Sequence, residues 1–327
     1  MKVIPFHKKI LFLTSMTIIF FSSSCSTSQS HENEVTQVIN ILPSTNLSAI
    51  DFAYDQMIKN GVSPTFAKKL ETQFLKEKNR IEIRDQIVEL NVLGFLTPGD
   101  YSKHFSVSAV KHIKKFIKKY RTTLSKAEKE FHVPNEIVAS LLWVETKHGK
   151  FTGKFHLPFV YFSLLQATHP EVATSVLNEL NFRKPSSNSS SANLSYTELQ
   201  QKVLLRLSSK SKWAVEQIKI LEQINSKQNT LSKHAQSILS IRSSFAGAFG
   251  CSQFIPSSYQ KYAVSASKKT PNLFELKDCI FSVANFLNKN GWDTQNQKAQ
   301  SDALFEYNRI RDYGDVIQKL AKAARGV

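Results

Sequence analysis

Glu145 is the residue of this chain whose position most clearly suggests chemistry. It follows the apolar run IVASLLWV at residues 137–144 and continues the apolar face of that predicted helix. Burial makes a carboxylate costly to ionise, and the C-terminal end of a helix is also unfavourable to negative charge. Lys147 lies two residues after Glu145 and so lacks the three- or four-residue spacing that would bring its cation to the carboxyl group. The pattern therefore predicts a raised pKa, which a general acid requires near neutral pH.

The alternative for Glu145 is structural, with a buried partner that satisfies the carboxyl group. Other chemistries are not favoured by the sequence. The nine histidines form no HExxH motif and no close metal-ligand pattern, and we find no GxSxG motif, phosphate-binding glycine loop or Cys-His motif. The second distinctive segment is SSFAGAFGCSQFIPSSY at residues 243–259, where small residues allow the backbone to approach another helix or a ligand closely.

The elements that must position these residues are predicted to be helices. Pro134 is a favourable first-turn residue for the helix that carries Glu145, and Gly149 is a stop signal after it. Residues 107–131 place apolar side chains at spacings of three and four, with lysines on the other face. A membrane-surface helix has this pattern too, but a core stripe with a solvated basic side is favoured. Strand-like alternation is scarce, so the predicted fold class is mainly α.

The composition indicates a folded protein with an anionic partner. Of 327 residues, 41% are hydrophobic, which argues against a globally disordered chain. A total of 43 Lys and Arg against 26 Asp and Glu gives a formal charge of +17. This charge favours nucleic acid, a lipid surface or an acidic polymer as partner, without choosing among them.

The N-terminus predicts export. Lysines precede an apolar stretch at residues 10–21 that is too short for a membrane span, and three serines then precede Cys25. Residues 1–24 are predicted to be a signal peptide, and Cys25 the lipidated first residue of a tether at residues 25–48. An ordinary signal peptide with a chance cysteine and a membrane anchor helix are the alternatives. Export makes nucleic acid a poor partner despite the charge.

Cys251 and Cys279 are the two cysteines that remain in the mature chain. Two cysteines are no disulfide framework for a chain of this size, so a disulfide and two buried free thiols both stay open. The low-complexity sequence KPSSNSSSANLS at residues 184–195 predicts a mobile insertion.

Four motifs, in order from about Asp51 to the C-terminus, resemble the lytic murein transglycosylase B family, glycoside hydrolase family 103. They are VPNEIVASLLWVETKHGKF, SSFAGAFGCSQFIPSSYQKYAV, DCIFSVANFLNKNGW and EYNRIRDYGDVIQKLA. The motifs are specific in combination, whereas any one alone is weak. The resemblance implies a lysozyme-like domain at residues 131–327, a helical flank at residues 49–130, and a long cleft for the glycan strands of peptidoglycan.

The resemblance also implies roles for individual residues. Glu145 matches the single catalytic acid/base of the family. The residues that match groups lining the cleft are Ser244, Gln253, Phe254, Tyr307, Asn308 and Tyr313.

The implied reaction cleaves the β-1,4 bond between N-acetylmuramic acid and N-acetylglucosamine and forms a 1,6-anhydro end, with no metal or organic cofactor. The implied partners are peptidoglycan strands and, through the lipid anchor, a membrane. The implied location is the periplasm, at the outer membrane, and the implied state is a monomer. A non-catalytic peptidoglycan-binding lipoprotein and a hydrolytic muramidase on the same fold are the alternatives.

Two segments depart from the family pattern. The best-known member carries an acidic calcium loop where this chain has SASKKTPNLFE at residues 265–275, which predicts no calcium site here. The family also has paired arginines near a Tyr-Pro, whereas this chain has ATHPEVA with His169 and Glu171. The resemblance therefore does not indicate which residues of this chain would contact the peptide or lactyl carboxylates of the substrate.

Overall fold

Helices make up nearly all the regular structure in the computed structural model, which describes residues 42–226 and 238–326. Within those residues there are thirteen α-helices, three short 3₁₀-helices and one pair of two-residue strands. The predicted mainly α class is confirmed. The predicted signal peptide, Cys25 and most of the predicted tether lie outside the described residues.

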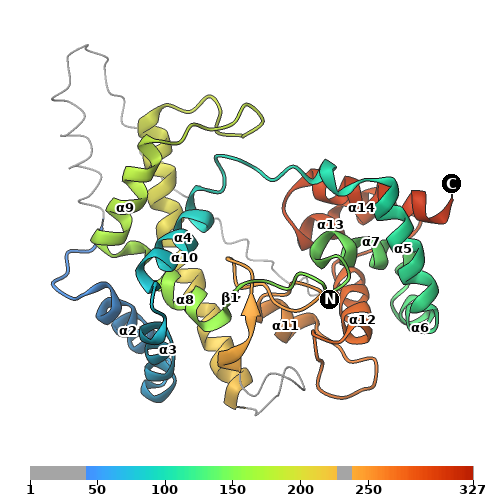
Figure 1. Ribbon diagram of the computed structural model, residues 1–327, viewed down its shortest axis with the longest axis horizontal. Coiled ribbons are helices and arrows are strands. Elements are labelled where there is room, and N and C mark those ends of the chain that lie inside the picture. Colours follow the sequence, from blue (N-terminus) through green and yellow to red (C-terminus); the bar gives the residue numbers. More distant parts are fainter. Residues whose placement is uncertain (1–41, 227–237, 327) are drawn as a thin grey trace, which may run out of the picture.

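Helices from two separate stretches of the chain form a first packing group, on the left of Figure 1. At its centre α8 packs against α3, α4 and α10, and every residue of α8 is buried because its sequence, LPFVYFSLL, is apolar on all sides. The members of the group are α2 (Ala49–Lys59), α3 (Pro64–Lys76), α4 (Arg80–Leu93), α8 (Leu157–Leu165), η2 (Gln166–Thr168), α9 (Pro170–Asn181) and α10 (Tyr196–Ser226).

The second packing group lies on the right of Figure 1 and is organised around α7. Helix α7 packs against α5, α12 and α14, and eight of its twelve residues are buried. The members of this group are η1 (Tyr101–His104), α5 (Val107–Lys119), α6 (Arg121–Phe131), α7 (Asn135–Thr146), α12 (Leu276–Lys289), α13 (Gln297–Tyr307) and α14 (Arg311–Arg325).

Short elements connect the two groups. Strands β1 (Phe155–His156) and β2 (Arg242–Ser243) pair antiparallel, and the short helix η3 (Ile238–Ser240) contacts α8. Helix α11 (Pro256–Tyr262) contacts α10 in the first group and α12 in the second. The loop between β2 and α11, which carries the SFAGAFG motif, therefore runs from one group to the other.

The expected boundary between a flank and a core at residue 130 does not coincide with these groups. Helices α5 and α6, expected in the flank, pack against α7, α12 and α14, whereas α8 to α10, expected in the core, pack against α2 to α4. The chain passes between the groups after α4, after α7 and after α10. A single cut in the sequence cannot separate them for that reason.

The lysine-rich stretch at residues 107–131 forms α5 and α6, which are separated at Tyr120. Its apolar stripe is buried and its lysines are exposed, as the core interpretation predicts. The buried side chains of the stripe are Ala109, Ile113, Phe116, Leu124, Ala127 and Phe131.

The low-complexity insertion at residues 184–195 makes defined contacts, contrary to the prediction of a mobile segment. The hydroxyl of Ser189 donates to the carbonyl oxygen of Phe95 at 2.8 Å, and the backbone N–H of Ser186 donates to that of Leu96 at 2.8 Å. Serine hydroxyls can satisfy backbone carbonyls in this way. The insertion is thereby attached to the segment that follows α4.

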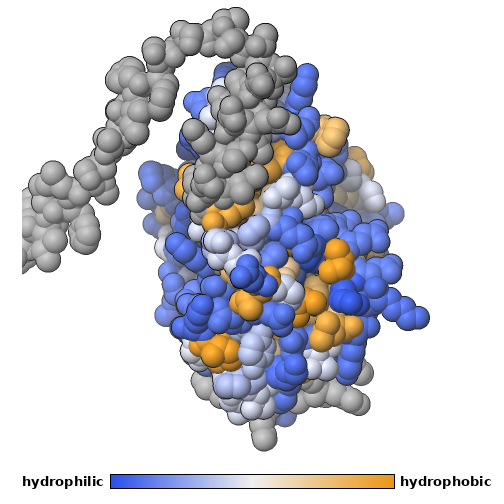
Figure 2. Space-filling model, turned by 90° about the vertical axis from the view of Figure 1, so that its left-hand side faces the viewer, coloured by the Kyte–Doolittle hydropathy of each residue, from blue (hydrophilic) through white to orange (hydrophobic). Residues whose placement is uncertain are grey.

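One face of the first group is mostly hydrophilic. On the side that carries α2, α3 and α9, Figure 2 shows hydrophilic residues with small, separate hydrophobic patches between them. Among the described residues, no helix combines the length and the apolar character that crossing a bilayer requires.

Candidate active site

Glu145 lies at the C-terminal end of α7, where the chain turns sharply away. Helix α7 ends at Thr146, and Lys147, His148 and Gly149 all have positive φ angles, of 51°, 58° and 83°. The predicted stop at Gly149 is thus part of a three-residue left-handed turn. Such a conformation is uncommon for non-glycine residues and must be held by its surroundings. It leaves the Glu145 side chain at the end of the helix.

The surroundings of Glu145 favour its protonated form. Its side chain is only partly exposed, and its carboxyl group is enclosed by protein atoms. Burial raises the pKa of Glu145 to about 7, and a hydrogen bond from Tyr313 partly offsets that rise. No cation contributes to the pKa shift. The raised pKa predicted from the sequence is therefore confirmed in direction, and burial, one of its two predicted causes, accounts for it.

The cation nearest in sequence is engaged elsewhere. The ammonium of Lys147 donates a 2.9 Å hydrogen bond to Nδ1 of His104 and lies 4.8 Å from the centre of the Trp143 ring. Burial lowers the pKa of both Lys147 and His104. These contacts explain why Lys147 does not stabilise the ionised form of Glu145.

Two tyrosines form a wall beside the carboxyl group. Tyr313, fully buried on α14, donates a 2.5 Å hydrogen bond to Oε1 of Glu145. The Tyr307 ring lies parallel to the Tyr313 ring at 6.2 Å, and its hydroxyl donates to the carbonyl oxygen of Ser252 at 2.5 Å. Burial, together with the Glu145 charge, raises the pKa of both phenols well above the usual value, so both remain donors.

Asn308 joins the wall through a residue that the sequence analysis missed. Its side-chain N–H donates to the hydroxyl of Tyr101 at 2.9 Å, and the Tyr101 ring meets Tyr313 edge-on at 5.4 Å. Tyr101 belongs to η1, between α4 and α5, and has no helical periodicity that would mark it. The available signal was local: a Pro-Gly turn and Asp100, which caps η1.

The remaining predicted residues divide into a wall residue and two loop residues. Phe254 is buried, and its ring lies 5.8 Å from that of Tyr307. The Ser244 hydroxyl accepts from two backbone N–H groups of its own loop, those of Ala246 and Ala248. The amide of Gln253 donates to the carbonyl oxygens of Gly250 and Thr152. Ser244 and Gln253 thus shape the loop, whereas Phe254 joins the aromatic wall.

The segment that replaces the paired arginines is engaged in the first group. Nε2 of His169 lies 3.0 Å from the carbonyl oxygen of Leu47, and Glu171 accepts a 3.1 Å hydrogen bond from the buried guanidinium of Arg84. These contacts hold the start of α9 against the segment before α2 and against α4.

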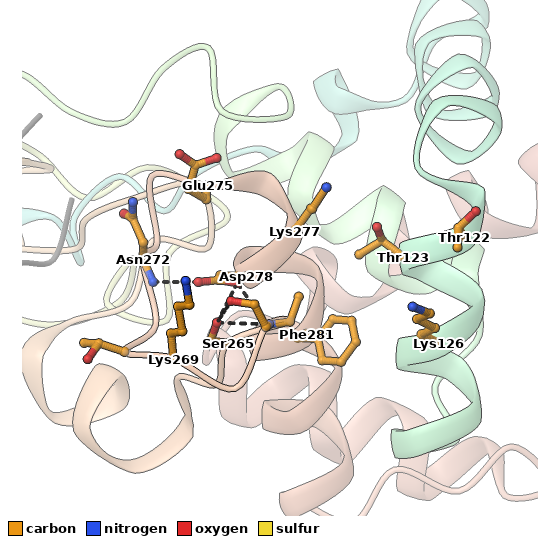
Figure 3. A pocket seen from close by; sticks show the side chains of 13 residues that line it. Thr122, Thr123, Lys126, Ser265, Lys269, Asn272, Glu275, Lys277, Asp278 and Phe281 are labelled. Carbon is orange, nitrogen blue, oxygen red and sulfur yellow. Dashed lines mark hydrogen bonds between the residues drawn. The ribbon is translucent and has the colours of Figure 1, made fainter. Parts of the chain in front are cut away.

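A cavity of about 780 Å³ lies between α6 and α12, and Glu145 is not among its lining residues. Figure 3 shows it beside the loop at residues 265–275, with Lys126 and Lys277 at its rim. The Asp278 carboxylate accepts hydrogen bonds from Ser265 Oγ and from the backbone N–H groups of Ala266 and Asn272. Within the described part of the chain, His, Cys, Asp and Glu side chains form no group of three that could hold a metal ion.

Residues 49–314 match a protein family described as the Transglycosylase SLT domain. Over 185 residues the chain is 29% identical to the membrane-bound lytic murein transglycosylase B of Escherichia coli (strain K12). That alignment covers 56% of this chain and 39% of the relative, so the chain spans about two fifths of the relative's length.

Solved structures show the same fold. The Escherichia coli lytic transglycosylase SLT35, in complex with bulgecin A, matches with a TM-score of 0.59 and 17% identity over 86% of this chain and 93% of that one. SltB1, a soluble lytic transglycosylase from Pseudomonas aeruginosa, matches with a TM-score of 0.56 and 18% identity over 85% and 99%. With the family match over residues 49–314, the resemblance seen in the sequence motifs is confirmed, and this chain belongs to the transglycosylase SLT domain family.

Proposed function

We propose that this protein is a lytic transglycosylase that cleaves the β-1,4 bond between N-acetylmuramic acid and N-acetylglucosamine in peptidoglycan. The observation that carries the proposal is the enclosed carboxyl group of Glu145, whose pKa is raised to about 7. A group with this pKa is populated in both protonation states near neutral pH, so it can give a proton and take one back. Family membership and the lytic transglycosylases of the same fold support this choice of reaction.

In the first step Glu145 protonates the glycosidic oxygen, and the bond from that oxygen to muramoyl C1 breaks. The 2-acetamido group of the same sugar stabilises the positive charge that develops at C1, a substrate-assisted route outside the usual two-carboxylate scheme. In the second step the ionised Glu145 removes the proton of the muramoyl O6 hydroxyl, and O6 bonds to C1. The products are a 1,6-anhydro end and a free hydroxyl, and no water is consumed.

The aromatic wall has a defined part in this proposal. Tyr313 holds the carboxyl group in one orientation, and Tyr307 and Phe254 supply a wall that limits the access of water to C1. Water at C1 would give hydrolysis instead of the anhydro product. We assign substrate contacts to the exposed parts of Asn308, Ser244 and Gln253.

The test is digestion of purified peptidoglycan sacculi by Glu145→Gln, with products separated by chromatography and weighed by mass spectrometry. We expect anhydro products to fall by about 10²–10⁴-fold, because Gln cannot exchange the proton. Glu136→Gln is the matched control: Glu136 lies at the other end of α7, pairs with Arg325, and should leave the rate unchanged. A near wild-type rate in Glu145→Gln would refute the assignment.

The same assay separates the alternatives. A hydrolytic muramidase would release reducing ends, which are heavier by one water than anhydro ends. A non-catalytic binding protein would sediment with the sacculi and release no fragments.

We further propose that Cys25 is lipidated and holds the protein, as a monomer, at the periplasmic face of the outer membrane. Support comes from the short apolar stretch ending in small residues before Cys25 and from the membrane-bound relative. Cys25→Ser should move the protein from the membrane to the soluble fraction on cell fractionation. Unchanged membrane association would defeat the idea.

A further inference from the structure

Cys251 and Cys279 form a disulfide that joins the loop before α11 to α12. Their Cα atoms are 6.1 Å apart, and both residues are almost fully buried. The structure thus selects one of the two alternatives that the sequence leaves open. Cys279 lies in the first turn of α12, a helix with ten buried residues among fourteen. The disulfide therefore ties the turn at residues 249–254 to one of the best-packed helices of the second group.

The tied turn touches the residue that follows the proposed acid. The hydroxyl of Thr146 donates to the carbonyl oxygen of Cys251 at 3.0 Å and accepts from the backbone N–H of Gly149 at 2.8 Å. One side chain thus connects the end of α7, the left-handed turn after it and the disulfide-bonded residue. Gly149 also lies close to Cys251, because a methyl group at its Cα would be 3.5 Å from Cys251 Cβ.

The same turn also holds the aromatic wall. The hydroxyl of Tyr307 donates to the carbonyl oxygen of Ser252, the residue after Cys251. Consecutive carbonyl oxygens of one short segment thus position both the backbone beside Glu145 and the ring beside Tyr313.

The other restraints on the turn are non-covalent, and they include the Phe254 ring, which lies 5.8 Å from that of Phe286 on α12. Gly250 and Gln253 have positive φ angles, of 71° and 51°, and one bridge between Phe249 and Phe254 closes it. The N–H of Cys251 donates to the carbonyl oxygen of Leu273, which belongs to a loop rather than a helix. The disulfide adds a covalent connection between this turn and α12.

We infer that the Cys251–Cys279 disulfide is a positioning device for the reaction, because it fixes the two carbonyl oxygens that hold Thr146 and Tyr307 beside Glu145. This inference rests on the proposed function and adds to it two residues that do not touch the substrate. It predicts that loss of the disulfide changes the pKa of Glu145 and lowers kcat, in addition to any change in stability.

The variant that tests the inference is the full chain with both Cys251→Ala and Cys279→Ala. Loss of the bond lets the turn move and admits water to the carboxyl group, so we expect kcat to fall by about tenfold to a hundredfold with KM within about twofold. The alkaline limb of the pH profile of kcat should move to lower pH, because better hydration favours the ionised carboxylate of Glu145 and so lowers its pKa. Unchanged kcat and an unchanged limb would overturn the inference.

The control is Val176→Ala on α9 in the first group. Val176 is buried and its truncation also lowers stability, but none of the contacts described around Glu145 involves α9. It should lower the melting temperature and leave the alkaline limb in place. A shift of the limb in this variant equal to that of the double variant would reduce the disulfide to a stabiliser and overturn the inference.

Thr146→Val keeps the disulfide and tests the same link if the double variant does not fold. Valine has nearly the same shape but lacks the hydroxyl that reaches Cys251. The limb should again move to lower pH, while Thr146→Ser should restore the wild-type profile. A Thr146→Val variant with wild-type kcat and limb would overturn the inference.

A readout without substrate separates this inference from the proposed function. The pKa of Glu145 can be followed by carbon NMR of labelled glutamate carboxyl groups, assigned with Glu145→Gln. A lower pKa of Glu145 in the double variant supports the positioning role of the disulfide. If the wild-type protein releases no anhydro product, that result contradicts the proposed function and leaves this support unchanged. An unchanged pKa would overturn the positioning whatever the products are.

Discussion

The hydroxyl of Tyr313 donates a 2.5 Å hydrogen bond to Oε1 of Glu145, across 168 residues of sequence. The bond opposes burial: burial raises the pKa of Glu145, and a donor to the carboxylate lowers it. Burial is the larger effect, so the pKa rises to about 7. Tyr313 therefore both orients the acid and limits how far its pKa rises.

Tyr313→Phe should move the alkaline limb of the activity profile to higher pH. The variant removes the donor and keeps the ring, so the pKa of Glu145 rises and its protonated form persists further into the alkaline range. The measurement is the rate of anhydro-product release between about pH 5 and pH 9. Tyr262→Phe is the control, since that hydroxyl faces Asn290. A limb that moves to lower pH would contradict the assigned balance of effects.

Glu145→Gln should stabilise the protein at alkaline pH and not at acid pH. The folded-state pKa of Glu145 is raised from 4.5 to about 7, so between these values the folded state holds a proton that the unfolded state has lost. The free energy of unfolding of the wild type then falls as pH rises through this window, by about 3 kcal/mol in total. Glutamine has no such loss. Urea unfolding of both proteins at three pH values from below 4.5 to above 7 measures the difference, and a pH-independent difference would contradict the raised pKa.

Gly247→Ala should destabilise the protein more than Gly291→Ala. Both glycines have positive φ, of 73° and 83°, so both variants bear a similar backbone cost. At Gly247 the added methyl overlaps the ring and hydroxyl of buried Tyr161, whereas at Gly291 it meets no atom within 4 Å. The extra loss in the free energy of unfolding should be about 1–3 kcal/mol. Equal losses in the free energy of unfolding of the two variants would contradict this prediction, because they would mean that Tyr161 moves aside without destabilising the protein.

Calcium and chelators should leave the melting temperature unchanged. Asp278 already accepts three hydrogen bonds from the loop that it closes, and Lys268 and Lys269 stand in that loop. Asp278→Ala should instead lower the free energy of unfolding by about 1–3 kcal/mol, because buried donors lose their acceptor. Exposed Glu275 lines the same cavity and gives the control, Glu275→Gln. A clear stabilisation by added calcium would contradict this account.

The sequence predicted those parts of the site that depend on local pattern. The apolar run before Glu145 was enough to expect burial and a raised pKa, and the resemblance added Tyr307, Asn308 and Tyr313. Tyr101 was missed because η1 is short and aperiodic, and its role depends on contact with residues two hundred positions later.

Long-range packing accounts for the other differences. The two packing groups do not follow the expected boundary at residue 130, because each group contains helices from both sides of it. The state of Cys251 and Cys279 could not be decided from spacing alone, since it depends on how the turn before α11 meets α12. The insertion at residues 184–195 was expected to be mobile because of its low-complexity composition. Composition does not reveal that its serines reach backbone carbonyl groups such as that of Phe95.

The division of the chain into two packing groups confines the surroundings of Glu145 to one of them. The hydrogen bonds and ring contacts described around Glu145 come from the second group and from the turn tied to α12. The first group, which carries α8 to α10, contributes none of them. The proton affinity of Glu145 is therefore set by contacts within the second group and the turn tied to α12. Substitutions in α2–α4 and α8–α10 should accordingly change the stability of the protein and leave the pKa of Glu145 in place.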